Sequence, residues 1–494
     1  MLEPSILFCC LLPFLFIFIK SFPTIFSNKH KSNPFIVNYF SLYTNRHHLI
    51  QWTSKIVNSS PTLTIIIRRP FSPNRVITAN PEVVHHILYT KFSTYPKGEM
   101  IRTTLSDFLG EGIFNIDGDN WKFQRQISSH EFNTKSLRNF VENVVDFELN
   151  ERLIPILKTA AVNETVLDLQ DILQRFTFDN ICRIAFGYDP GYLTSSLTKP
   201  EFAVAFEDAV RITTERFPVI TPILWKIKRF FNVGSEKRLR EAVLEVRRFA
   251  RKILNEKKQE PAGKSLDGSS DLLSRFISSG YSDERLLTDI VISFILAGRD
   301  TTSSALTWFI WILCKNPKIE EKVVKEIREK SDSPIYDEVK DMVYTHASIC
   351  ESMRLYPPVP LDSKVCSADD IWPDGTVMKK GTMVTYHTYA MGRLENIWGQ
   401  DCMEFRPERW LEKDDSTTKV KFVAKDSYMY PVFQAGPRIC LGKDMAFVQM
   451  QKVLASILRK FKVVPVVDVN IEPVLELGLT LKMKNGFPVR IVKR

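Results

Sequence analysis

The most informative segment of this chain reads Phe433-Gln434-Ala435-Gly436-Pro437-Arg438-Ile439-Cys440-Leu441-Gly442. Its two glycines, Gly436 and Gly442, permit backbone conformations and close approaches that a Cβ would block. Helical periodicity over 443–460 places Cys440 just before a helix N-terminus, where the helix dipole favours a thiolate. A loop that presents one thiolate with no base beside it suits a metal ligand better than a nucleophile. On spacing alone, a structural cysteine in a glycine-containing turn is an equally good interpretation.

This loop resembles the haem-binding segment of the cytochrome P-450 superfamily, F-x-x-G-x-R-x-C-x-G, at Phe433, Gly436, Arg438, Cys440 and Gly442. The resemblance implies that Cys440 is the axial thiolate ligand of the iron of haem b. It also implies that the other four residues belong to the cofactor-binding set. Three further segments match the superfamily in the expected order along the chain, which makes coincidence negligible.

The segment Ala297-Gly298-Arg299-Asp300-Thr301-Thr302 resembles the A-G-x-D/E-T-T motif of the superfamily's central helix. The resemblance implies that Gly298 lets the helix distort beside the cofactor and that Thr301 and Asp300 are catalytic, Thr301 in oxygen activation and Asp300 in its connection to bulk protons. Superfamily members that rearrange peroxides tend to lack this threonine, so its presence favours true oxygen activation. From the residues alone, a threonine bonded back to the carbonyl four residues earlier, beside a salt-bridged aspartate, is the alternative.

Two segments predict a structural ion-pair network. Glu351 and Arg354 resemble the superfamily's E-x-x-R and share a helix face at i and i+3, although such a pair alone carries little weight because most are exposed. The segment Phe405-Arg406-Pro407-Glu408-Arg409-Trp410 resembles the P-E-R-F/W segment. The resemblance implies that Glu351, Arg354 and Arg409 form a network that locks the scaffold beneath the haem.

The segment Trp121-Lys122-Phe123-Gln124-Arg125 resembles the superfamily's W-x-x-x-R motif. At i and i+4 on a helix, its first and last residues point the same way. The resemblance implies that Trp121 and Arg125 bind a haem propionate, as Arg438 also does. Lys364 falls where many relatives place another propionate-binding basic residue.

The formal net charge of +10 admits nucleic acid, an anionic membrane or an acidic protein as a partner. The densest basic run, at 247–258, is mixed with glutamates on a helical pattern, so we interpret it as a solvated helix face and expect no nucleic-acid partner. The eight cysteines form no C-x-x-C pair, which fits neither a disulfide framework nor a zinc site and indicates a reducing compartment.

The sequence contains no G-x-G-x-x-G strand–helix unit for a dinucleotide, so electrons must come from another protein. The resemblance implies that this partner is NADPH–cytochrome P-450 reductase. Basic groups near the ligand loop, at Arg438, Lys443 and Lys122, suit the docking of an acidic reductase.

The N-terminal segment is apolar and uncharged from Ser5 to Ile19. Fifteen helical residues extend only about 22 Å, but adding 20–26, with Lys20 snorkelling, reaches the length needed for a hydrocarbon core of roughly 30 Å. Positive charges follow the run, which favours an uncleaved anchor over 1–26, with the catalytic domain in the cytosol, rather than a cleaved signal peptide. We expect a single-pass protein of the endoplasmic reticulum membrane.

Hydrophobic periodicity predicts a mainly α (α+β) class. We expect one cytochrome P-450 fold with a small β component over 61–494, behind a hinge at 27–60 that follows the anchor. The predicted helices cover 83–90, 121–130, 135–158, 167–186, 201–215, 235–258, 284–315, 317–329, 342–355 and 443–460. The predicted strands cover 63–68, 75–79, 383–386, 463–467, 479–483 and 488–492.

The predicted distal segments are apolar, which indicates a lipophilic substrate. They comprise Ile113, Phe114, Phe294, Leu296, 359–361 and 477–479. Segments at 95–98, 112–115, 123–125, 386–393 and 433–438 resemble the plant 86 clan, and those at 179–182 and 348–360 resemble its family 94. That family consists chiefly of fatty-acid ω-hydroxylases, and some members oxidise the ω-carbon of an amino-acid-conjugated jasmonate.

The resemblance implies a haem-thiolate monooxygenase that hydroxylates the terminal carbon of medium- to long-chain fatty acids, with O2 and electrons from NADPH. Oxidation of a jasmonoyl–amino acid conjugate, or of another lipid or sterol, is the alternative. A non-catalytic haem sensor is disfavoured by the intact Asp300–Thr301 pair. Selectivity for the terminal carbon requires a narrow channel that holds the methyl end in place. Lys97 and Arg102 are candidate partners for the distant carboxylate.

Overall fold

The computed structural model describes residues 35–38, 41, 44–45, 48–68, 73–217, 222–259, 271–413 and 420–494. The predicted anchor at 1–26 lies outside these residues, as does the first part of the predicted hinge. No helix among the described residues combines the length and apolar character needed to cross a membrane.

Helices make up most of the described chain, which confirms the mainly α class. The α-helices are α3 (Leu49–Ser59), α4 (Pro81–His85), α5 (Gly98–Leu109), α6 (Gly118–Ser129), α7 (Thr134–Asn139), α8 (Ile154–Val162), α9 (Leu169–Phe186), α10 (Glu201–Glu215), α11 (Pro222–Phe230), α12 (Gly234–Gln259), α13 (Leu272–Ser278), α14 (Glu284–Cys314), α15 (Pro317–Arg328), α16 (Tyr336–Lys340), α17 (Val343–Leu355), α18 (Thr388–Met391), α19 (Glu395–Trp398) and α20 (Lys443–Lys460). Shorter π and 3-10 segments include η6 (Phe140–Val145), η7 (Glu148–Leu153), η9 (Pro431–Phe433) and η10 (Gly436–Arg438).

The predicted helices at 201–215 and 443–460 coincide with α10 and α20. The single helix predicted over 135–158 is instead a succession of α7, η6, η7 and α8, because the turns widen to π geometry twice along it. Periodicity gave no prediction for α3, α5, α11 or α13.

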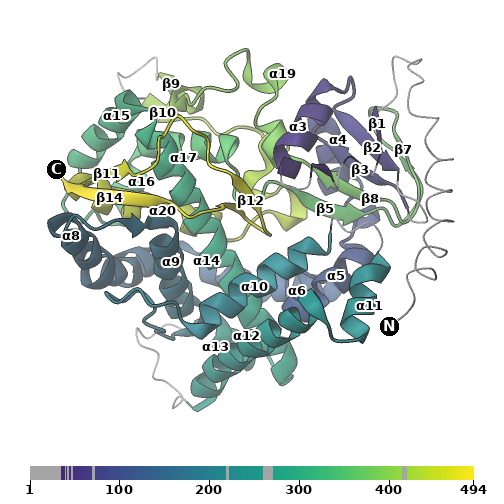
Figure 1. Cartoon of the computed structure of the whole chain (residues 1–494), viewed down its shortest axis with the longest axis horizontal. Helices are drawn as coiled ribbons and strands as arrows, with labels where there is room; N and C mark the ends of the chain where they lie inside the picture. Colours follow the sequence, from purple (N-terminus) through teal and green to yellow (C-terminus); the bar gives the residue numbers. More distant parts are fainter. Residues whose placement is uncertain are drawn as a thin grey trace, which may run out of the picture.

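The strands are β1 (Phe35–Asn38), β2 (Thr64–Arg68), β3 (Arg75–Thr78), β4 (Leu167–Asp168), β5 (Asp362–Val365), β6 (Asp370–Ile371), β7 (Val377–Met378), β8 (Met383–Tyr386), β9 (Leu411–Lys413), β10 (Val420–Phe422), β11 (Phe461–Pro465), β12 (Leu475–Leu477), β13 (Leu481–Met483) and β14 (Pro488–Lys493). The main sheet has the order β1-β2-β3-β8-β5 and lies on one side of the molecule, with most long helices on the other (Figure 1). Within the stretch predicted as a hinge, β1 pairs with β2 and α3 packs on α18 and β2, so this part of the chain is joined to the body.

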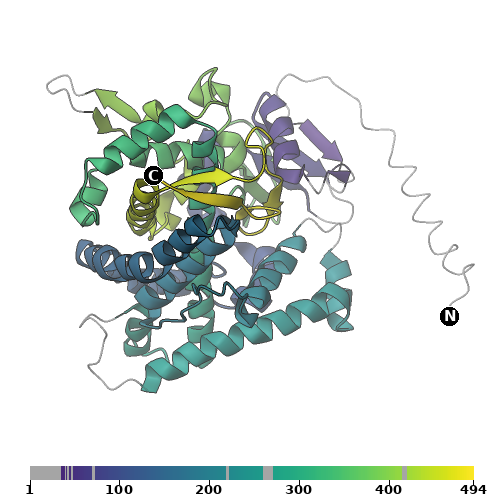
Figure 2. The same cartoon turned by 60° about the vertical axis from the view of Figure 1, so that its left-hand side comes forward.

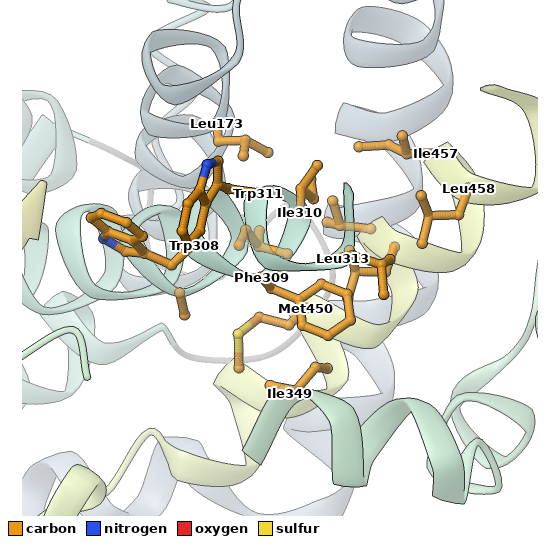
Figure 3. Close-up of a cluster of buried hydrophobic side chains, with 14 of the residues drawn as sticks. Leu173, Trp308, Phe309, Ile310, Trp311, Leu313, Ile349, Met450, Ile457 and Leu458 are labelled. Atoms are coloured by element: carbon orange, nitrogen blue, oxygen red, sulfur yellow. The ribbon is translucent and has the colours of Figure 1, made fainter. Parts of the chain in front are cut away.

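The helix α14 crosses the middle of the molecule and is buried on nearly all sides (Figures 1 and 2). Most of its buried side chains are apolar, as expected for a helix packed on all sides, but Arg299 and Asp300 are buried in it as well. Its C-terminal half contributes Trp308 and Trp311, whose rings meet edge to face at 5.6 Å, to a core that also receives Met450 and Ile457 from α20 (Figure 3). This core fixes α20 against α14, and so sets where the loop before α20 lies.

A cysteine-lined cavity as the candidate functional site

The loop that carries Cys440 consists of two 3-10 turns, η9 and η10, followed by α20. The Cys440 backbone N–H donates to the Phe433 carbonyl at 2.8 Å and closes the loop. Because α20 begins at Lys443, the cysteine lies three residues before the first helical residue. The prediction that Cys440 lies just before a helix N-terminus is therefore confirmed.

The packing of the loop gives a steric reason for glycine at one of its two glycine positions but not at the other. Gly436 has φ +64°, and a Cβ there would lie 2.2 Å from the Leu88 carbonyl oxygen, so a side chain is excluded. Gly442 has φ −85°, and a Cβ would meet Cys440 Sγ at 3.9 Å, an ordinary contact. The packing of the protein alone therefore requires glycine at 436 but not at 442.

The Cys440 side chain is accessible, and it faces an internal cavity rather than the outer surface. Removal from bulk water raises the pKa of the thiol, whereas the Gly442 N–H and the charges of Arg125 and Lys443 lower it. A positive charge bound over the sulfur would favour the thiolate, which is the chemistry of a metal ligand. Among the described residues, no cluster of three metal-ligating side chains occurs, so the candidate is this single thiolate.

The cavity has a volume of about 1230 Å³. This exceeds the roughly 300–1,000 Å³ of a common small-molecule site, so a large cofactor and a substrate could share it. All the predicted distal segments line it: Ile113, Phe114, Phe294, Leu296, 359–361 and 477–479. Thr301 lines the same cavity as Cys440, on α14.

Two guanidinium groups flank the Trp121 ring at the cavity wall. The Arg438 guanidinium carbon lies 4.3 Å from the ring centre and that of Arg125 lies 5.9 Å from it. Arg438 donates to the Ile116 carbonyl and to the Asp117 carboxylate, and Arg125 donates to the Ile439 carbonyl. Trp121, Arg125, Arg438 and Lys364, the four predicted propionate-binding residues, all line the cavity, and the last three bring basic groups to it.

A second polar cluster on the same wall surrounds the Asp362 carboxylate. Lys97 Nζ lies 3.0 Å from Oδ1 and Lys364 Nζ lies 3.4 Å from Oδ2. The charges of these lysines, Lys364 first, outweigh burial and hold the pKa of Asp362 well below its usual range, whereas burial lowers the pKa of Lys364 to about 7. We did not predict Asp362 from the sequence, although residues two apart in a strand share a face and Lys364 was a candidate.

Gly298 packs against the neighbouring helix α9. A Cβ at this position would lie 2.5 Å from Ile181 Cγ1 and within 2.7 Å of two more atoms of that side chain. The helix α14 continues through this point without a break from Glu284 to Cys314. The steric reason for this glycine is therefore the close approach of two helices.

Thr301 and Asp300 adopt the geometry that the residues alone left open as an alternative. Thr301 Oγ1 donates to the Ala297 carbonyl at 2.6 Å, and its oxygen lone pairs remain as acceptors. The Asp300 carboxylate is fully buried outside the cavity lining and pairs with Arg299 at 3.2 Å and Lys482 at 3.8 Å. Neither carboxylate oxygen of Asp300 has a hydrogen bond among the described residues.

The predicted ion-pair network is assembled away from the cavity. Arg354 donates to both Glu351 oxygens, at 2.8 and 2.7 Å, and Arg409 Nε donates to Oε1 at 3.1 Å. Trp410 Nε1 donates to Oε2 at 3.0 Å, and Glu351 and Arg354 are completely buried. Arg354 also donates to the carbonyls of Cys402 and Glu404, so the network ties α17 to the chain before η9.

These observations fit a large anionic cofactor with a metal at its centre. The donor set offers one thiolate, and the wall offers Arg125, Arg438 and Lys364 for acidic groups. The missing Cβ of Gly436 allows the loop to lie against the Leu88 backbone, although Gly436 itself is outside the cavity lining. Apolar side chains from α14, among them Phe294, Leu296 and Ala305, also line the cavity, which suits the faces of a macrocycle.

Comparison with known proteins gives a consistent match over nearly the whole chain. A family model described as Cytochrome P450 matches residues 29–488. The chain is 60% identical over 464 residues to Cytochrome P450 94A1 of Vicia sativa, covering 94% of this chain and 90% of that protein. It is 58% identical to Cytochrome P450 94A2 of Vicia sativa, covering 94% and 91%. It is 44% identical to Cytochrome P450 94B1 of Arabidopsis thaliana, covering 97% and 95%.

Proposed function

This chain belongs to the cytochrome P450 family, in plant family 94, and we propose that it hydroxylates the terminal carbon of medium- to long-chain fatty acids. Membership implies a monooxygenase with haem bound through a cysteine thiolate, a redox partner and a lipophilic substrate. The terminal position and the fatty-acid class are the specific parts of the proposal.

In this proposal Cys440 supplies the thiolate, and Trp121, Arg125 and Arg438 hold the acidic edge of the haem. Phe433, Gly436 and Gly442 shape the loop around the cysteine, and Lys364 offers a further cation. The haem, when bound, supplies the activation of dioxygen. Glu351, Arg354 and Arg409 act outside the cavity as the structural support of this loop.

The proposed proton-handling residue is Thr301. Its hydroxyl oxygen accepts a hydrogen bond from a donor in the cavity while its own proton is held by the Ala297 carbonyl. Rotation about χ1 turns the same proton toward the cavity. Asp300 is the adjacent acid, and it lies 3.8 Å from the ammonium of Lys482, whose side chain is partly exposed. In this proposal water connects Asp300 to Thr301, because no hydrogen bond joins the two side chains directly.

The apolar lining of the cavity is the observation that supports a lipid substrate. Ile113 and Phe114 before α6, Phe294 on α14 and Leu477 and Leu479 of the C-terminal hairpin all contribute to it. Such a lining binds a hydrocarbon chain by burial rather than by specific hydrogen bonds. Terminal hydroxylation then depends on steric positioning, because the terminal C–H bond is not the weakest one available.

The carboxylate end requires a cation at the periphery of the cavity. Of the two predicted candidates, Lys97 lines the cavity but is paired with Asp362, and Arg102 is outside the lining and pairs with Glu111 at 3.5 Å. Arg211 and Lys484 also line the cavity, at a partly exposed and an exposed position, and of these Arg211 is paired with Asp208 and Glu215. These two positions suit a carboxylate that stays near water while the chain is buried.

Electrons are proposed to come from NADPH–cytochrome P-450 reductase. Lys122 and Lys443, near the cysteine loop, are exposed and suit docking of an acidic protein. Arg438, the third predicted docking residue, is turned inward and paired with Asp117, so it does not contribute to this surface. Attachment to the endoplasmic reticulum membrane by residues 1–26 is part of the same proposal.

The decisive experiment supplies reductase and NADPH to membranes that contain the protein. Saturated and unsaturated acids of about 12 to 18 carbons are compared with jasmonoyl-isoleucine, and product regiochemistry is read by mass spectrometry. We expect ω-hydroxy acids as the main products. Turnover of the conjugate alone would reject the fatty-acid proposal, and absence of any turnover from a haem-loaded protein would favour a non-catalytic haem sensor.

A further inference from the structure

Gln434 adopts a backbone conformation that residues with a side chain rarely occupy. Its φ is +63° and its ψ is 179°. This region is almost exclusive to glycine, because the Cβ is crowded by the backbone. Gln434 occupies one of the unspecified positions of the cysteine-loop motif, so the motif alone gave no reason for its identity.

The strained residue lies at a turning point of the loop. The chain turns at Gln434 and again at Gly436, which has φ +64°, before it reaches Cys440. The Cys440 N–H bonds to the carbonyl of Phe433, the residue directly before Gln434. Relaxation of Gln434 to negative φ would therefore rotate the segment that carries Cys440 relative to the carbonyl that holds it.

The Gln434 side chain is held at both of its polar atoms. Its Nε2 donates to Asp362 Oδ2, and its Oε1 contacts the Tyr386 hydroxyl, which also lies 2.7 Å from Asp362 Oδ2. Because a hydroxyl carries a single proton, the amide and carboxylate oxygens share it as acceptors. Tyr386 itself is buried.

The two residues that hold Gln434 are themselves fixed by the main sheet. Asp362 on β5 and Tyr386 on β8 are direct cross-strand partners. The Oδ1 atom of Asp362 accepts hydrogen bonds from Lys97 Nζ at 3.0 Å and from the Ser363 N–H at 2.7 Å. The clamp on Gln434 is thus part of a rigid element that is distant from the cysteine loop in sequence.

We propose that Tyr386 and Asp362 are positioning residues that clamp the Gln434 side chain, hold its backbone in the glycine-like conformation and thereby fix Cys440 against the haem iron. The inference rests on the proposed role of Cys440 as the thiolate ligand. Strain of this kind persists only where surrounding contacts over-determine it, and here both polar atoms of one amide supply those contacts.

The test compares Gln434→Ala with Gln434→Gly in the haem-loaded protein. Alanine keeps the strained backbone and removes the clamp, whereas glycine removes the clamp and the strain together. We expect haem to be released about tenfold faster from Gln434→Ala than from the parent, with part of the reduced carbon monoxide complex losing its thiolate-type Soret band. Gln434→Gly should retain most of that band.

A double-mutant cycle assigns the clamp to Tyr386. Tyr386→Phe should accelerate haem release in the parent and have little effect on top of Gln434→Gly, because glycine no longer needs the clamp. Asp362→Asn should follow the same pattern. Tyr281→Phe is the matched control, since that hydroxyl has no hydrogen bond among the described residues and lies outside the cavity lining; it should leave both readouts unchanged.

Three results would overturn the inference. These are a Gln434→Ala protein that behaves like the parent, equal haem loss from the alanine and glycine variants, and an undiminished effect of Tyr386→Phe in the glycine background. Circular dichroism of each variant establishes that the fold is intact. Since neither readout needs a lipid substrate, failure of fatty-acid hydroxylation would leave this result standing.

Discussion

The guanidinium carbon of Arg438 lies 4.3 Å from the centre of the Trp121 ring. The same guanidinium donates to the Ile116 carbonyl at 2.9 Å and to Asp117 at 2.7 Å. A planar, five-donor group can stack and form these two bonds at once, which a lysine cannot do. The wall of the cavity that faces the predicted propionates thus depends on arginine geometry as well as on charge.

Replacing Arg438 by lysine should therefore lower the haem-to-protein ratio and the midpoint of thermal unfolding. Loss of the stacking alone corresponds to about 0.5–2 kcal/mol. Arg138→Lys is the matched control, because that guanidinium lies 4.8 Å from the Tyr336 ring on the exposed surface and pairs with Asp337. Equal haem content in Arg438→Lys and the parent would contradict the assignment.

Breaking the buried Glu351–Arg354 pair should prevent accumulation of stable protein. Arg354→Ala leaves a completely buried carboxylate with fewer donors, a change that typically costs about 3–5 kcal/mol. Lys379→Ala breaks an exposed pair with Asp369 and should change stability by no more than about 1 kcal/mol. Yields of folded protein and thermal unfolding midpoints check this, and similar values for the two variants would refute it.

Gly298→Ala should destabilise the protein by about 1–3 kcal/mol, because the new methyl group would overlap the Ile181 side chain. Ile181→Ala should restore part of the lost stability when combined with it. The measurement is a double-mutant cycle on the free energy of unfolding. Strictly additive effects would show that the contact between α9 and α14 is not the reason for this glycine.

Thr301→Ala should lower the amount of product formed per O2 consumed, because it removes the hydroxyl of a residue that lines the cavity. Thr301→Ser retains that hydroxyl and should retain most of the coupling. Thr307→Ala is the matched control, since Thr307 is also bonded back to a carbonyl of α14 but does not line the cavity. Unchanged coupling in Thr301→Ala would remove this residue from the proposed mechanism.

Stability should fall as pH rises from about 4.5 to about 7 because of Glu148. Burial, and next the charge of Asp179, raises its pKa to about 7 in the folded protein, so the folded state holds a proton that the unfolded chain has released. Burial likewise raises the pKa of Asp179 to about 6, which acts in the same direction.

The check is the midpoint of thermal unfolding measured between about pH 5 and pH 7.5. Glu148→Gln removes the ionisation and should flatten the decline relative to the parent. Arg152, which donates to Glu148 at 2.7 Å, should remain bound to Asp189 and Asp179 in this variant. An identical pH slope in parent and variant would exclude Glu148 as its source.

The sequence determined the features that depend on local spacing. Periodicity predicted α10 and α20 at their observed bounds, because regular amphipathic patterns are encoded within a few turns. Of the site residues predicted from the motifs, Trp121, Arg125, Arg438, Thr301 and Cys440 line one cavity, whereas Asp300 and Gly436 lie outside its lining. Residues at i, i+3 and i+4 need only a helix to share a face.

The tertiary structure alone decided the features that join distant segments. Gln434 and Asp362 meet although they are 72 residues apart, and Gly298 is required by Ile181 on another helix. The buried Asp300 carboxylate lies outside the cavity lining and meets Lys482 from the C-terminal part of the chain. No local pattern reports such contacts, because they arise only when the sheet, α9 and α14 pack together.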